Sequence, residues 1–120
     1  MKKILIVDDD PLILDLFEFS FDQASFEIIR ARNGREGLEK ALKERVDLIL
    51  LDVMMPDLNG HEVCRRIKDN PATRATKVIM VSAKVQKEEI EAGLRAGADE
   101  YITKPFDPLS LVEKITKLLE

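Results

Sequence analysis

Residues 3–10 read KILIVDDD, a short apolar run that ends in three consecutive aspartates. A continuous rather than alternating apolar run is typical of a strand that is buried on both faces of a sheet. Runs of the same kind recur along the chain and predict further strands at Phe26–Arg30, Asp47–Leu51, Lys77–Val81 and, with a weaker pattern, Glu100–Thr103. We therefore expect a sheet of five short strands.

The segments between these runs carry apolar residues at helical spacing. The residues that mark the five expected helices are Leu12, Leu16 and Phe19; Leu38, Ala41 and Leu42; Val63, Cys64 and Ile67; Ile90, Leu94 and Ala98; and Leu109, Val112, Ile115 and Leu119. Turn residues agree, since Asn59-Gly60 opens the third helix and Asn70-Pro71 closes it. This alternation predicts an α/β fold with a doubly wound parallel sheet of strand order 2-1-3-4-5, of the flavodoxin-like type.

Composition limits the classes of protein to which the chain can belong. Its 120 residues are 45% apolar and 35% charged, which fits one globular domain over residues 1–120. The apolar runs are too short for a membrane span or a secretory signal, so we expect a cytoplasmic protein with no membrane insertion. A net charge of −4 argues against direct binding of nucleic acid. The single cysteine, Cys64, excludes an internal disulfide, and we expect it to be inert in the core.

The net charge of −4 equals the charge of four aspartates that come directly after apolar runs: Asp8, Asp9, Asp10 and Asp52. In an open α/β sheet, ligands bind beyond the carboxyl ends of the strands where the winding reverses, here between the first and third strands. Carboxylates from both strands would repel each other at that point unless a divalent cation lay among them. Oxygen ligands without His or Cys favour Mg²⁺, or Mn²⁺. The simpler interpretation of residues 8–10 as a helix cap before Pro11 requires only one acid, and Asp10 suffices.

Two more polar side chains follow strands on the same side of the expected sheet. Ser82 follows the fourth strand and Lys104 follows the fifth. A cation, a hydroxyl and a lysine around one aspartate form an arrangement that binds a phosphoryl group. An aspartate in this setting can attack phosphorus and form an acyl phosphate. Asp52, which stands alone at its strand end, is the candidate for that role.

Four motifs occur along the chain: VDDD at 7–10, LLDVMMPDLNG at 50–60, VSA at 81–83 and YITKPF at 101–106. Together they resemble the receiver domain of two-component response regulators, of which the chemotaxis-type single-domain regulators are the simplest members. The resemblance implies that a sensor histidine kinase or a phosphotransfer protein phosphorylates Asp52. It also implies that Mg²⁺ is bound by Asp9, Asp52 and the backbone carbonyl of Met54, with Asp8 acting through water.

The resemblance further implies a switch. Ser82 would supply the switch hydroxyl, Lys104 would pair with the phosphoryl group, and Tyr101 would move with Ser82. The face formed by the fourth helix, fifth strand and fifth helix would then change and act on a protein partner, a fused output domain or a second copy of the chain. We expect the inward side of this face to include Ile90, Leu94 and Val112. Such a module is not a metabolic enzyme, because it catalyses only its own phosphorylation and dephosphorylation.

Two other classes of protein share parts of this pattern. Phosphatases of the haloacid dehalogenase type also use a strand-end aspartate with Mg²⁺, but Leu12 occupies the last position of their D-x-D-x-T/V motif, and the chain lacks room for a substrate cap. Flavin or nucleotide modules on this fold hold phosphate with a loop rich in Gly, Ser and Thr after the first strand. Here that loop reads DDDP, which repels phosphate.

Two residues are expected to set the lifetime of the acyl phosphate. Met54 and Lys84 lie two residues after Asp52 and Ser82, where they flank the approach of water to phosphorus. Neither is an acid or an amide that orients water, so we expect slow hydrolysis. His61, the only histidine, has no histidine or cysteine beside it and is expected at the surface.

Overall fold

The computed structural model describes residues 2–21, 26–55, 57–84 and 86–120. Its strands are β1 (Lys2–Val7), β2 (Phe26–Ala31), β3 (Leu48–Asp52), β4 (Lys77–Ser82) and β5 (Glu100–Thr103). Its helices are α1 (Pro11–Phe21), α2 (Gly34–Glu44), α3 (Gly60–Asp69), α4 (Lys87–Arg95) and α5 (Pro108–Leu118). The predicted alternation is confirmed. Asp52 and Ser82 are the last residues of β3 and β4 rather than the first residues of the loops.

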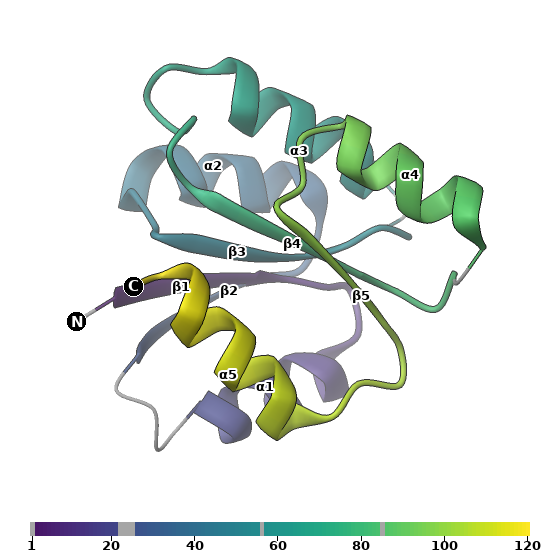
Figure 1. The fold of residues 1–120 in the computed structure, drawn as a ribbon. Helices are drawn as coiled ribbons and strands as arrows, with labels where there is room; N and C mark the ends of the chain where they lie inside the picture. Colours follow the sequence, from purple (N-terminus) through teal and green to yellow (C-terminus); the bar gives the residue numbers. More distant parts are fainter. Residues whose placement is uncertain (1, 22–25, 56, 85) are drawn as a thin grey trace.

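The strands form one parallel sheet in the order β2-β1-β3-β4-β5, as expected. Figure 1 shows α1 and α5 on one face of the sheet and α2, α3 and α4 on the other. Each face has its own apolar core, one around Phe17 and Phe21 and one around Val63 and Ile67. Because every residue of β3 is buried, its side chains reach both cores, which explains its continuous apolar run.

Side-chain caps fix where the helices begin, and hence where the loops at the carboxyl edge of the sheet end. The Asp10 carboxylate accepts a hydrogen bond from the backbone N–H of Leu12 at 2.9 Å, which confirms its expected capping role. Asn59 caps α3 through the N–H of Glu62, and Asp107 caps α5 through the N–H of Leu109. Among the residues described, no helix is long and apolar enough to cross a bilayer.

The sequence predicted α1 but did not identify its buried face. Leu12 is 75% exposed and Phe19 is 81% exposed, whereas Leu14, Phe17 and Phe21 lie in the core. The helix is apolar nearly all round, so the spacing of its apolar residues does not select one side.

The placement of Leu94 on the inward side of α4 was wrong, since its side chain is 47% exposed. Helix α4 approaches the sheet through Gly93, where an added Cβ would lie 2.9 Å from both Met80 Sδ and Tyr101 Cδ2. Contact this close requires a residue without a side chain, and the larger Leu94 is turned outward. Ile90 and Val112 are half-buried, in agreement with their expected orientation.

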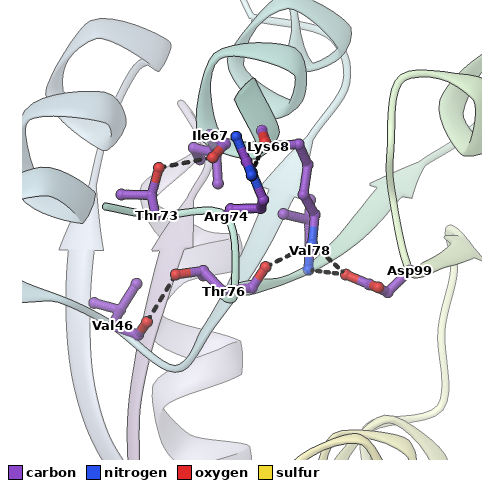
Figure 2. Close-up of polar contacts among 8 residues, drawn as sticks. All are labelled: Val46, Ile67, Lys68, Thr73, Arg74, Thr76, Val78 and Asp99. Atoms are coloured by element: carbon purple, nitrogen blue, oxygen red, sulfur yellow. Dashed lines mark hydrogen bonds and ion pairs between the residues drawn. The ribbon is translucent and has the colours of Figure 1, made fainter. Parts of the chain in front are cut away.

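A polar network fastens the loop between α3 and β4 at the amino end of the sheet (Figure 2). The Thr76 hydroxyl donates to the Val46 carbonyl at 3.0 Å, and the Lys68 ammonium donates to the Thr76 carbonyl at 2.8 Å. Asp99 accepts from the same ammonium at 3.0 Å and from the backbone N–H of Val78 at 2.8 Å. These contacts tie α3, β4 and the start of β5 together at the end of the sheet opposite the candidate site.

Candidate functional site

The polar residues singled out in the sequence meet at the carboxyl edge of the sheet. Strand register places Val7 beside Leu51 and Asp52 beside Val81, so β1, β3 and β4 end at the same level. Asp8 follows β1 directly, and Asp52 and Ser82 end their own strands. The first and third strands are neighbours only because of the order 2-1-3, which is why acids far apart in sequence lie together.

Asp8, Asp9 and Asp52 form a compact group of carboxylates. One oxygen atom from each lies within 4.8 Å of the others. Asp8 and Asp52 are buried, at 2% and 6% exposure, while Asp9 is exposed to solvent. The donor set consists only of oxygen atoms and carries negative charge, which fits a hard cation such as Mg²⁺ better than a softer metal. The cluster therefore meets the chemical requirement for the expected ion.

The acids of this cluster are held in an unfavourable electrostatic setting. Burial, followed by the negative charge of Asp8, raises the pKa of Asp52 to about 6, against the lowering effect of Lys104. Burial also raises the pKa of Asp8, although the N–H of Asp10 and the charge of Lys104 act in the opposite direction. With a pKa of about 6, Asp52 is mostly ionised at neutral pH, and its buried charge gains from any added positive charge.

Lys104 is the cation that the fold supplies to these acids. Its ammonium nitrogen lies 3.3 Å from Asp8 Oδ2 and 3.8 Å from Asp52 Oδ1. The backbone N–H of Lys104, directly after β5, donates to the Ser82 carbonyl at 2.8 Å, which places the residue beside the end of β4. The Lys104–Pro105 peptide is cis. A lysine between two acids can bind a phosphoryl oxygen when one arrives.

Ser82, Lys84 and Tyr101 are connected through the backbone of Lys84. The Lys84 N–H donates to Ser82 Oγ at 3.1 Å, and the Tyr101 hydroxyl donates to the Lys84 carbonyl at 3.1 Å. The ammonium of Lys84 lies 3.5 Å from Glu89 Oε1 on α4. The serine and tyrosine singled out in the sequence are thus coupled by one residue of the loop after β4.

The loop after Asp52 is folded tightly against the end of β3. The Met54 N–H donates to Asp52 Oδ1 at 3.2 Å, and the Gly60 N–H donates to the Val53 carbonyl at 3.0 Å. An added Cβ at Gly60 would lie 2.7 Å from the Asp52 carbonyl oxygen, so only glycine fits there. The Met54 side chain is 58% exposed beside the site.

Sequence reasoning missed two acids with defined partners near this edge. Glu89 was not assigned to the expected site, yet it forms the ion pair with Lys84. Asp57 was not singled out, yet its carboxylate accepts hydrogen bonds from the backbone at the start of α2. Both contacts join a loop to a different element, and no local sequence pattern signals contacts of that kind.

The single cysteine and the single histidine do not belong to the carboxylate cluster. Cys64 is buried as expected, and burial raises the pKa of its thiol to about 11, which keeps it protonated. His61 is half-buried rather than at the surface, and its buried Nε2 has no hydrogen-bond partner among the described residues. Burial, followed by the charge of Arg65, lowers the pKa of His61, so the imidazole is neutral at pH 7.

Comparison with known proteins identifies the family. The family model described as the response regulator receiver domain matches residues 4–116 of this chain. The chain belongs to this family. As a receiver domain it is 41% identical over 119 residues to the response regulator ArlR of Staphylococcus saprophyticus, covering 99% of this chain and 53% of that protein. It is 42% identical over 117 residues to the transcriptional regulatory protein ResD of Bacillus subtilis, covering 98% of this chain and 48% of that protein.

Solved receiver domains share the fold. The chemotaxis protein CheY4 of Vibrio cholerae superposes with a TM-score of 0.92 at 32% identity, covering 99% of both chains. The chain therefore matches a chemotaxis protein over its whole length, whereas it spans about half the length of the curated relatives.

Proposed function

We propose that this receiver domain accepts a phosphoryl group on Asp52 in a Mg²⁺-dependent reaction and thereby switches a protein-binding face. The observation that carries the proposal is the meeting of Asp52 with two further carboxylates and the Lys104 ammonium at one strand edge. The donor of the phosphoryl group would be a histidine kinase or a phosphotransfer protein. We further propose that the chain acts in the cytoplasm and has no activity on external substrates.

The transfer requires an ionised Asp52. A pKa of about 6 leaves most of this carboxylate ionised at pH 7. Its oxygen forms a new bond to phosphorus while the phosphorus–nitrogen bond to the donor histidine breaks, and the electron pair of that bond returns to the imidazole. Mg²⁺ would supply positive charge to the phosphoryl oxygens. Asp9, Asp52 and the Met54 backbone carbonyl are the groups that would hold it, with Asp8 acting through water. Lys104 would pair with a phosphoryl oxygen.

The switch would start at Ser82. Its hydroxyl accepts from the Lys84 N–H, and it would leave this contact to donate to a phosphoryl oxygen. The Lys84 carbonyl also accepts a hydrogen bond from the Tyr101 hydroxyl. A shift of this loop would therefore remove the contact that holds Tyr101 in place. Helix α4, strand β5 and helix α5 would then present a changed face to a protein partner, a fused output domain or a second copy. The charge of the phosphoryl group can shift the equilibrium between the resting and the switched conformation only if its contacts differ between the two.

The proposed function is tested by labelling with a small acyl-phosphate donor. We expect intact mass to show one added phosphoryl group in the presence of Mg²⁺, and peptide analysis to locate it on Asp52. In chelator, or in Asp9→Ala with Mg²⁺, we expect labelling to slow by on the order of a hundredfold, because the phosphoryl charge is no longer neutralised. Asp69→Asn, an exposed acid at the end of α3, is the matched control. Full labelling of wild type in chelator, or stoichiometric labelling at another residue, would contradict the proposal.

The switch is tested by amide chemical shifts with beryllium trifluoride and Mg²⁺ as a phosphoryl mimic. We expect changes at Ser82 and Lys84 that extend through Tyr101 to α4, because hydrogen bonds link the three residues and the Tyr101 ring lies against Gly93 of α4. Amides of Thr73 and Thr76, at the fastened end of the sheet, should stay in place and serve as the internal control. Changes that stop at Lys84 would rule out Tyr101 as part of the switch.

The lifetime of the acyl phosphate is expected to depend on Met54 and Lys84. Both side chains are partly exposed beside the site, and neither orients water for attack. We expect Met54→Asn with Lys84→Glu to speed the decay of labelled protein by about tenfold, less than the hundredfold or more of a fully positioned base. Lys84→Glu also replaces an ion pair with repulsion from Glu89. Lys87→Glu, on the exposed side of α4, controls for charge, and equal decay constants in all proteins would refute the assignment.

A further inference from the structure

The Asp57 carboxylate, in the loop between β3 and α3, accepts hydrogen bonds from the backbone at the start of α2. The Gly34 N–H donates to Asp57 Oδ1 at 3.0 Å, and the Arg35 N–H donates to Asp57 Oδ2 at 3.0 Å. The next N–H groups are satisfied locally, because Glu36 donates to Asn33 Oδ1 at 2.8 Å and Gly37 donates to the Asn33 carbonyl at 3.0 Å. The free amides of Gly34, Arg35 and Glu36 in the first turn are therefore all paired, two of the three by a residue more than 20 positions away.

The same loop lies in close contact with the helix. An added Cβ at Gly34 would lie 2.8 Å from Leu58 Cβ and 2.9 Å from the Leu58 carbonyl oxygen. At its other end the loop is anchored to β3 through the contact between Gly60 and the Asp52 carbonyl. The path from Asp52 to Gly60 is thus fixed at both ends, and the Asp57 carboxylate supplies the only hydrogen bonds to α2 found for this loop among the described residues.

The surroundings of Asp57 favour its ionised form, which accepts both hydrogen bonds from α2. Desolvation pushes the pKa of Asp57 upward, but the N–H groups of Arg35, Leu58 and Gly34 push it further down, so the net shift is a lowering. Asp57 therefore stays ionised wherever Asp52 is ionised. A negative charge at the start of a helix is also favoured by the helix dipole.

We propose that Asp57 is a positioning residue for the Mg²⁺ site: by holding the loop against the start of α2, it fixes the backbone of Met54. The inference rests on the proposed function in one respect, namely that the Met54 carbonyl is a metal ligand. Met54 lies between Asp52 and Asp57, with its N–H held by Asp52 Oδ1 on one side and the Asp57 link to α2 on the other. If the link to α2 is lost, the carbonyl is free to move while the three carboxylates stay in place. Metal affinity should then fall although no ligand has been removed.

The test compares Asp57→Ala with Asn33→Ala. Both changes remove a cap from the same helix, so each should lower the urea midpoint of unfolding by a similar amount. Only Asp57→Ala releases the loop. Mg²⁺ is titrated into isotope-labelled protein, and affinity is read from the amide shifts of Asp9 and Met54, without any phosphoryl donor. We expect Asp57→Ala to bind Mg²⁺ roughly tenfold more weakly than wild type and Asn33→Ala to bind it as wild type does.

Two further measurements keep the outcomes distinct. Asp57→Asn, which retains one acceptor oxygen, should recover part of the affinity, and the Gly34 and Arg35 amides should exchange faster with solvent only in the Asp57 variants. Equal Mg²⁺ affinity in wild type, Asp57→Ala and Asn33→Ala would overturn the inference and leave Asp57 as a helix cap. If affinity depends on Asp57 but no protein can be phosphorylated, the inference stands and the proposed function fails.

Discussion

Asp52→Asn is expected to be more stable than wild type by about 3 kcal/mol at pH 7 in the absence of divalent cations. The pKa of Asp52 rises from 3.8 in the unfolded chain to about 6 in the fold, and each pKa unit corresponds to about 1.4 kcal/mol. The side chain is only 7% exposed, so solvent screens little of this cost. Asparagine keeps the shape and an acceptor oxygen for the Met54 N–H but carries no charge.

The sign of the pH dependence follows from the direction of the shift. A raised pKa means that the folded protein binds the proton more tightly than the unfolded chain does. The contribution of Asp52 is therefore fully favourable below about pH 4 and is lost as the pH rises through about 6. The stability difference between Asp52→Asn and wild type should shrink toward pH 4.

Urea unfolding of both proteins in chelator, at pH 4.5 and pH 7, measures this difference. Asp69→Asn, an exposed acid, should behave as wild type at both pH values. Added Mg²⁺ should stabilise wild type more than Asp52→Asn, because binding to the folded state adds to its stability. Equal unfolding free energies for wild type and Asp52→Asn at pH 7 in chelator would show that the site carries no such cost.

Lys104→Met is expected to slow phosphorylation by on the order of a hundredfold, the effect of removing one group that stabilises charge in a transition state. Lys104 lies within 4 Å of both Asp8 and Asp52 and is the basic residue that contacts them among the described residues. Methionine keeps much of the length of the side chain but cannot pair with a phosphoryl oxygen. The pKa of Asp52 should rise further, since the charge of Lys104 holds it down.

The initial rate of mass gain with a small acyl-phosphate donor measures the loss. Mg²⁺ affinity should be kept or increased, because a positive charge beside the cation is removed; this separates a defect in phosphoryl binding from a defect in metal binding. Lys114→Met provides the control, since that ammonium is half-exposed and lies 4.0 Å from Glu100. A Lys104→Met protein that is labelled at the wild-type rate would exclude Lys104 from the transfer.

The sequence predicted the parts of the site that depend on strand order. Asp52 and Ser82 end buried strands, and the expected strand order places the first strand beside the third, so the meeting of Asp52 with Asp8 followed from the apolar runs and that order. The ion pair of Lys84 with Glu89 did not follow, because it depends on the path of a loop between two elements. The contact of Asp57 with α2 was hidden for the same reason. In α1 the buried face was undetermined because apolar residues such as the exposed Leu12 and the buried Phe17 occur on more than one side of the helix.

Tyr101 has a consequence for how this protein can be observed. It is the only tyrosine, the chain has no tryptophan, and phenylalanine emits weakly, so nearly all ultraviolet emission comes from one phenol. That phenol donates to the Lys84 carbonyl, and its ring packs closely against α4 at Gly93. Loss of the contact changes the surroundings of the sole fluorophore. The unmodified protein thus carries its own optical reporter at the loop beside Ser82, and stopped-flow emission can time its movement without an attached dye.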